Sequence, residues 1–184
     1  MDARVDEVFR ATKTVGGAFV VAQHGEIVYE RYYGEQQKTT HVPVTANTYF
    51  RGASVTKLVT GIGLMKMMDE GILDPDEDIS TYLGYTVRNP RYMNTPIPLM
   101  SHTAGLVENA SFGRKSSILS DMIDVEKKAS ANFKKDVRPG SEYTYSNFGA
   151  GITGAIVESV TGMDVSSYMR QTLFEPLGID AAYS

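Results

Sequence analysis

The alternation of apolar and polar residues near the N-terminus predicts a β-hairpin. Residues 18–23 (AFVVAQ) are apolar on both faces, which is typical of a strand buried within a larger sheet. Residues 26–33 alternate between two faces, and His24 and Gly25 supply the tight turn between the two runs. Because an isolated hairpin is only marginally stable, further strands are expected to complete the sheet.

Apolar residues at helical spacing predict a mainly helical chain outside the hairpin. The expected helices cover residues 5–13, 54–70, 79–83, 117–128, 148–160 and 165–174. In the first two, the apolar residues at helical spacing are Val5, Val8, Phe9, Leu58, Ile62, Met65 and Met68. Gly71, Gly162 and Pro176 are the expected stops of three of these helices, whereas Pro96 and Pro98 indicate irregular chain.

Length and composition fit an ordinary globular protein. The 184 residues are 42% hydrophobic and 22% charged, which is enough apolar content for one domain with a core. The net charge of −4 argues against a nucleic-acid-binding surface. The chain has no cysteine, so disulfides, thiolate catalysis and cysteine-bound zinc are excluded. No apolar run is long enough for a membrane span, and the N-terminus lacks the apolar core of a signal peptide.

Ser54 and Lys57 form an S-x-x-K motif at the expected start of a helix. Residues three apart share one face of a helix, so the Lys57 ammonium or amine can reach the Ser54 hydroxyl. A hydroxyl becomes a good nucleophile only when a nearby base takes its proton, and a lysine amine can be that base. The motif alone is weak evidence, because a capping serine with a surface lysine one turn further on has the same spacing.

Tyr145 and Asn147 form a second candidate element, directly before the helix expected from residue 148. A tyrosine beside a lysine ammonium can relay protons to a leaving group, and an asparagine amide can hold a substrate amide. Core packing of Tyr145 and helix capping by Asn147 are the alternative interpretations. Together with Ser54 and Lys57, the pair favours catalysis by a serine nucleophile.

The remaining candidate chemistry is weaker. Ser101 and His102 suggest a Ser-His pair, but no serine lies in a G-x-S-x-G context and adjacent residues rarely face each other. His102 is therefore predicted to be a structural histidine that fixes its loop. The alternating aspartates from Asp74 resemble a calcium loop, but Ile79 stands where that loop requires glycine. The three histidines have no metal-ligand spacing, so neither a metal nor a cofactor is expected.

Five spaced segments occur in an order that is typical of one known family. They are residues 48–57 (TYFRGASVTK), 71–76 (GILDPD), 101–106 (SHTAGL), 139–147 (PGSEYTYSN) and 174–179 (FEPLGI). With these segments the chain resembles the penicillin-recognising serine hydrolases, on the branch of class C β-lactamases, D-Ala-D-Ala carboxypeptidases and family VIII-like esterases. The match runs from the hairpin to the end of the chain, so it is far more specific than S-x-x-K alone.

The resemblance implies a role for each candidate residue and a fold for the chain. Ser54 would be the acylated nucleophile, Lys57 its proton partner, Tyr145 the catalytic residue of the second motif, and Asn147 a substrate-binding residue. The implied fold is α+β, an α/β sandwich of the β-lactamase/transpeptidase-like type. In it a helical domain packs on an antiparallel sheet, of which this chain supplies only the N-terminal hairpin.

Members of the family also carry a third motif, K-T-G or H-x-G, on a later strand that supplies half of the oxyanion hole. No such motif occurs up to Ser184. Residues 1–184 are therefore expected to form a single, incomplete domain, with the hairpin at about 17–33 and a helical region at about 54–184. The parent protein is expected to be an enzyme, and this chain alone is expected to lack part of its machinery.

The implied function is hydrolysis through an acyl-enzyme of a β-lactam, a D-Ala-D-Ala peptide or a small ester. The alternative is a non-catalytic fragment or relative that acts as a binding or interaction module, because loss of one oxyanion donor costs about 100- to 1000-fold. The expected partners are a small-molecule or peptide substrate and, through an open sheet edge, another copy of the chain. Relatives usually work in the periplasm or outside the cell, so that location is expected, and a cytoplasmic one stays open.

Overall fold

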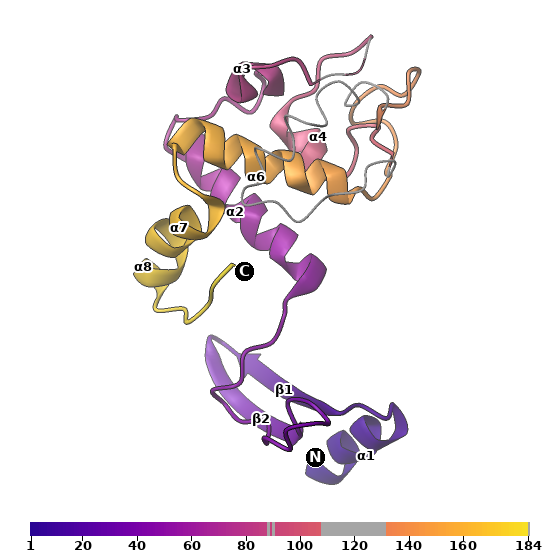
Figure 1. The fold of residues 1–184 in the computed structure, drawn as a ribbon, viewed down its shortest axis with the longest axis vertical. Helices are drawn as coiled ribbons and strands as arrows, with labels where there is room; N and C mark the ends of the chain where they lie inside the picture. The colour runs from indigo at the N-terminus through magenta and orange to yellow at the C-terminus, as the bar shows by residue number, and fades with distance from the viewer. Residues whose placement is uncertain (88, 90, 108–131, 184) are drawn as a thin grey trace. The chain divides into compact units, whose positions relative to one another are not determined.

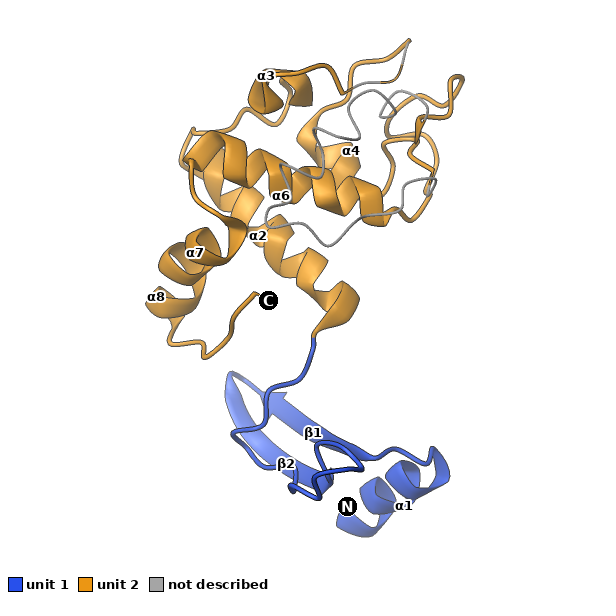
Figure 2. Cartoon of the chain, in the orientation of Figure 1, with its two compact units in different colours: residues 1–51 blue, residues 52–184 orange. Residues whose placement is uncertain are grey.

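The computed structural model describes residues 1–87, 89, 91–107 and 132–183. The chain falls into two compact units, Met1–Arg51 and Gly52–Ser184 (Figure 2). The helix expected over residues 117–128 lies outside the described residues. The expectation that residues 1–184 form a single, incomplete domain stays a prediction.

The first unit contains the predicted hairpin, preceded by one helix (Figure 1). Helix α1 covers Asp2–Ala11, and strands β1 (Gly16–Gln23) and β2 (Glu26–Gly34) pair antiparallel. Between the strands, His24 and Gly25 both have positive φ, at 54° and 83°. Two such residues make the tight turn whose twist matches that of the strands, so the hairpin prediction is confirmed.

Helix α1 is attached to one face of the hairpin by ring stacking and an ion pair. The rings of Phe9 and Tyr33 stack with centroids 4.9 Å apart. The Arg31 guanidinium donates two hydrogen bonds to the Asp6 carboxylate, at 2.8 and 3.0 Å. A Cβ at Gly17 would lie 2.5 Å from the Phe9 ring, so the close approach of α1 requires glycine there.

The first strand is not buried, contrary to expectation. Phe19 and Val20 in β1 are 42% and 50% exposed, and Val8 in α1 also faces solvent. Among the described residues the sheet has only two strands, and a ten-residue helix cannot cover both of its faces. The apolar residues of β1 are therefore typical of a strand in a larger sheet, although β1 is not buried within this unit.

Acid is expected to loosen α1 from the hairpin. The hydrogen bonds from Arg31 hold the pKa of Asp6 below its ordinary value of 3.8. A carboxyl with a lowered pKa stabilises the folded state above its unfolded-state pKa, and this contribution is lost as the pH falls through the folded-state value. The NMR ring shifts of Phe9, which report its stacking on Tyr33, should therefore move toward free-phenylalanine values as the pH falls below about 4.

The control for this effect is the Arg31→Met variant. Without the guanidinium, the Phe9 shifts should already be displaced at neutral pH and should change little on acidification. Because the ion pair is still partly open to solvent, the change is expected to be modest and to shrink in high salt. The same acid transition in both proteins would show that another group holds α1.

The second unit is helical, and α6 (Asn147–Thr161) lies at its centre. The other elements among the described residues are η1 (Ala53–Val55), α2 (Thr56–Asp69), α3 (Ile79–Leu83), α4 (Pro96–Met100), α7 (Val165–Met169), η3 (Arg170–Phe174) and α8 (Glu175–Leu177). Helix α6 packs against α2, α3, α4 and α7. Its inward residues Phe148, Ile152 and Ile156 are fully buried. These contacts form the core of the unit and fix the N-terminal end of α6.

Local signals set the bounds of several of these helices. Asp78 caps α3 by accepting a hydrogen bond from the Ser80 N–H, and Ser146 caps α6 by accepting one from Gly149. Gly162, with φ at 69°, ends α6 as predicted. The capping interpretation of Asn147 is wrong, because Ser146 occupies the cap position and Asn147 is the first helical residue.

The buried face of α2 is not the one that the apolar spacing indicated. Leu58 and Met65 are 64% and 47% exposed, whereas the buried residues of α2 are Thr60, Gly63, Leu64 and Met67. At Gly63 a Cβ would lie 2.2 Å from the Met169 side chain. Helix α2 thus buries the face that contains Gly63, because only glycine leaves room for the Met169 side chain. The spacing of large apolar residues does not indicate this face.

The expectations for the prolines are wrong at Pro96 and Pro98, which both lie in helix α4, and at Pro176. Pro96 begins α4, because a proline in the first helical turn loses no helical hydrogen bond and already has a suitable φ. Pro176 does not end the last helix, since helical chain continues to Leu177 and Gly178 follows with φ at 64°. Pro176 lies in the first turn of α8 (Glu175–Leu177), where a proline is tolerated because its missing N–H would have no helical partner.

Phe148→Ala is expected to lower the free energy of unfolding by about 3–5 kcal/mol, because it removes a fully buried ring and leaves a cavity. Chemical denaturation followed by circular dichroism measures this loss. Leu58→Ala is the matched control at an exposed site and should cost less than about 0.5 kcal/mol. Equal losses for the two variants would contradict the packing around α6.

Candidate active site

Ser54 lies in a strained turn immediately before α2. It is the middle residue of η1, and its side chain is exposed. The preceding Ala53 has φ at 44°, a left-handed conformation that costs a non-glycine residue about 1–3 kcal/mol. Strain of this kind gathers at functional sites, which supports a functional role for this turn. Sequence reasoning missed Ala53, because an alanine carries no signal for left-handed backbone.

The structure brings Ser54, Lys57 and Tyr145 together. The Ser54 Oγ lies 2.7 Å from the Tyr145 hydroxyl, and the Lys57 Nζ donates to the same Oγ at 3.3 Å. The Lys57 Nζ also lies 5.1 Å from the centroid of the Tyr145 ring. The expected spacing of Ser54 and Lys57 on one helix face, and the expected reach of Tyr145, are both present.

This arrangement can activate the Ser54 hydroxyl. As the Lys57 Nζ donates to Oγ, the serine proton is free to point at the Tyr145 oxygen, which then acts as the acceptor. If Lys57 is deprotonated, it accepts that proton directly. The N-terminal end of α2, a helix of 14 residues, favours negative charge developing next to Ser54.

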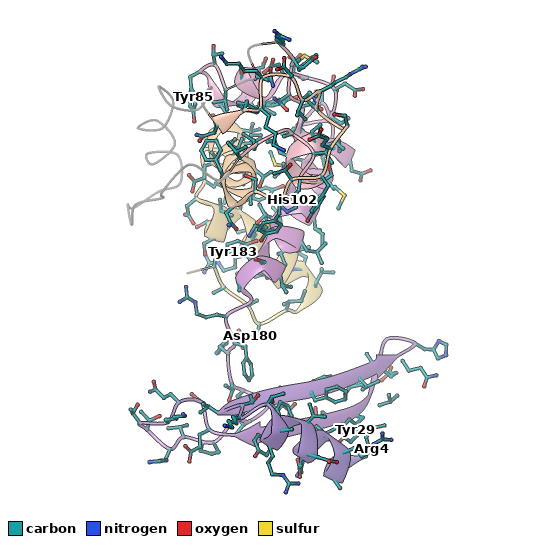
Figure 3. The ribbon with its side chains drawn as sticks, turned by 90° about the vertical axis from the view of Figure 1, so that its right-hand side faces the viewer. Arg4, Tyr29, Tyr85, His102, Asp180 and Tyr183 are labelled. Atoms are coloured by element: carbon teal, nitrogen blue, oxygen red, sulfur yellow. The ribbon has the colours of Figure 1, made fainter. Side chains whose placement is uncertain are left out.

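Tyr145 is held by the loop around His102. The Thr144 N–H donates to the His102 carbonyl at 2.7 Å, and the Ser146 N–H donates to the His102 Nδ1 at 3.2 Å. The ring of His102, which Figure 3 labels, lies with its centroid 4.5 Å from that of the Tyr145 ring. The prediction that His102 fixes its loop is confirmed, and the loop it fixes is the one that carries Tyr145.

Asn147 follows this loop as the first residue of α6, with an exposed side chain. Asn147 comes two residues after Tyr145 in the sequence. Both residues therefore lie at the N-terminal end of α6. The mutual contacts above join Ser54, Lys57 and Tyr145. A substrate-binding role for Asn147 stays a prediction.

Tyr183 braces the turn of α2 that carries Lys57. Its hydroxyl lies 2.9 Å from the Thr60 Oγ1 and donates to the Thr56 carbonyl at 3.3 Å (Figure 3). Burial raises the pKa of Tyr183, so its phenol stays protonated and able to donate near neutral pH. Sequence reasoning missed this brace, because nothing local links Tyr183 to a helix more than 120 residues earlier.

The described part of the chain contains neither a metal-binding group nor a membrane-spanning helix. Across residues 1–87, 89, 91–107 and 132–183, no three acidic, histidine or cysteine side chains gather in a metal-binding group. Within the same ranges, every helix is too short or too polar to cross a bilayer.

A serine, a lysine and a tyrosine meet at the start of α2, an arrangement that is typical of hydrolases with a serine nucleophile. The Beta-lactamase family model matches residues 1–183, so the chain belongs to the β-lactamase family. The helices and the two-stranded antiparallel sheet are part of the β-lactamase/transpeptidase-like fold, as expected from the sequence.

Esterase EstB of Burkholderia gladioli is 29% identical to this chain, over 97% of the chain and 49% of EstB. Penicillin-binding protein 4 of Amycolatopsis lactamdurans is 31% identical, over 89% of the chain and 43% of that protein. The octameric penicillin-binding protein homologue from Pyrococcus abyssi superimposes with a TM-score of 0.86 at 23% identity, over 99% of this chain and 43% of that one. The chain therefore spans less than half the length of these relatives.

Proposed function

We propose that the protein is a serine hydrolase in which Ser54 forms an acyl-enzyme. The observation that carries the proposal is the convergence of Tyr145 and Lys57 on the Ser54 Oγ, at 2.7 and 3.3 Å. A surface serine with only a capping role needs neither contact. The β-lactamase family membership supports the same conclusion.

In acylation, the Ser54 Oγ attacks the substrate carbonyl carbon while its proton passes to the neutral Lys57 amine, either directly or through the Tyr145 hydroxyl, which gives up its own proton as it accepts that of the serine. The positive end of the α2 dipole stabilises the oxyanion of the tetrahedral intermediate. The bond to the leaving nitrogen or oxygen then breaks, and Tyr145 delivers the proton to the leaving atom. Water attacks the acyl ester in the second half-reaction and regenerates the Ser54 hydroxyl. Asn147 would hold the substrate amide.

The substrate class is a small ester, a D-Ala-D-Ala peptide or a β-lactam. The names of relatives, which include an esterase, a penicillin-binding protein and a D-alanyl-D-alanine-carboxypeptidase, support this set without choosing within it. A panel of a chromogenic short-chain ester, a D-Ala-D-Ala peptide and a chromogenic cephalosporin tests the proposal. Turnover of at least one above the rate of the Ser54→Ala variant supports a hydrolase. No turnover of any would favour a binding or interaction module.

We propose in addition that copies of the chain associate through the open edges of the hairpin sheet. Phe19, Val20, Ile27 and Val28 expose apolar surface on a two-stranded sheet whose outer edges have no paired strand among the described residues. The Pyrococcus abyssi homologue is itself octameric. Light scattering should show a mass that rises with concentration, and Val20→Lys should reduce that rise.

The resemblance to the penicillin-recognising serine hydrolases, whose members usually work in the periplasm or outside the cell, supports a periplasmic or extracellular location, which we propose for this protein.

A further inference from the structure

His102 holds both neighbours of Tyr145 at once. Its backbone carbonyl accepts from the Thr144 N–H at 2.7 Å, and its Nδ1 accepts from the Ser146 N–H at 3.2 Å. Thr144 and Ser146 flank Tyr145 directly, so one residue secures the backbone on each side of the phenol. The His102 ring also packs on the Tyr145 ring at a centroid distance of 4.5 Å and a tilt of 40°.

The backbone of His102 is shaped for this double contact. Its φ is 58°, in the left-handed region that few residues other than glycine adopt and in which histidine, asparagine and aspartate are the commonest exceptions. In that conformation the carbonyl and the ring of one residue both face the chain at 144–146. The strain is offset by two hydrogen bonds to backbone groups that would otherwise need other partners.

The contact from Ser146 also fixes the form of the imidazole. A backbone N–H can only donate, so the His102 Nδ1 must present a lone pair. The ring is therefore neutral when the bond exists, with its proton on Nε2. A protonated ring would turn an N–H toward the N–H of Ser146 and would break the bond.

We propose that His102 is a positioning residue for catalysis, which sets the Tyr145 hydroxyl against the Ser54 Oγ by accepting the Ser146 N–H at Nδ1. This inference rests on the proposed function. The Tyr145 hydroxyl lies 2.7 Å from Ser54, where a displacement of about 1 Å costs on the order of 100-fold in rate. The position of Tyr145 is thus determined by a side chain that does not touch the reacting atoms.

A pair of variants separates this role from a general structural one. His102→Asn keeps a short side-chain acceptor and tolerates the left-handed backbone, so it should retain the wild-type kcat within about fivefold. His102→Gly also tolerates that backbone but has no acceptor, so it should lose roughly 100-fold in kcat with little change in KM. Thermal unfolding monitored by circular dichroism confirms that both variants are folded. Equal kcat values for the glycine variant and the wild type would overturn the proposal.

A readout that does not depend on activity distinguishes this proposal from the proposed function. In ¹⁵N NMR, the His102 Nδ1 of the wild type should give the shift of an unprotonated ring nitrogen, and the Ser146 amide should exchange slowly. The Ser146 amide should stay protected in His102→Asn and lose protection in His102→Gly. A protonated Nδ1, or a Ser146 amide whose exchange is unchanged in His102→Gly, would overturn the proposed role of the hydrogen bond from the Ser146 N–H to the His102 Nδ1. A wild type that shows both NMR signatures but hydrolyses nothing would instead refute the proposed function.

Discussion

Replacing Ser54 by alanine is expected to lower kcat for the preferred substrate by about 10⁴- to 10⁶-fold, the range seen when a covalent nucleophile is removed. The Ser54 Oγ is the atom on which Tyr145 and Lys57 converge, and alanine has no atom that can form the acyl bond. The side chain is small and exposed, so the fold should be unaffected. Steady-state kinetics with the substrate identified from the panel measure the loss.

Ser101→Ala is the matched control for this experiment. Ser101 stands next to His102 in the sequence, but its hydroxyl is engaged with the Ile97 carbonyl and with Thr103. The variant should retain kcat within about threefold, since neither contact reaches Ser54. If Ser101→Ala were inactive and Ser54→Ala active, the nucleophile would have been assigned to the wrong serine.

Tyr145→Phe should lower kcat by about 100- to 10,000-fold while KM changes little, because it deletes the group that exchanges a proton with Ser54. The phenylalanine ring can still pack on His102 and lie near the Lys57 Nζ. The variant therefore removes one oxygen and leaves the surrounding contacts in place. Rates measured over a range of pH show whether the missing group also removes an ionisation from the profile.

Tyr143→Phe provides the comparison for Tyr145→Phe. Tyr143 also meets the His102 ring, edge-on at 5.9 Å, but it is 69% exposed. Its hydroxyl should be dispensable, and kcat should stay within about threefold of the wild type. Similar losses in both tyrosine variants would assign the effect to the loop rather than to the hydroxyl on Ser54, and Tyr145 would lose its proposed role.

Elements defined by local chemistry could be predicted from the sequence. The hairpin follows from the turn at His24 and Gly25, and the end of α6 follows from Gly162. The short helix α3 has the same bounds as its prediction, residues 79–83. In each case the deciding interactions lie within a few residues, which is the range over which turn and cap preferences act.

Packing between distant elements could not be read in the same way. The buried face of α2 depends on its crossing with Met169, more than 100 residues away, and the brace on Thr56 depends on Tyr183. The contact of Ser54 with Tyr145 spans 91 residues and was predicted only through the order of the motifs. A family pattern records such long-range contacts, whereas hydrophobic spacing does not.

The most direct test of the central claim is to locate the covalent intermediate on the chain. The protein is mixed with an activated ester or a penicillin, quenched in acid within a turnover, and measured as an intact mass before tryptic mapping. The account predicts one acyl adduct per chain, carried by the peptide of residues 52–57 and absent from Ser54→Ala. An adduct on a peptide without Ser54, or an adduct that persists in Ser54→Ala, would contradict it.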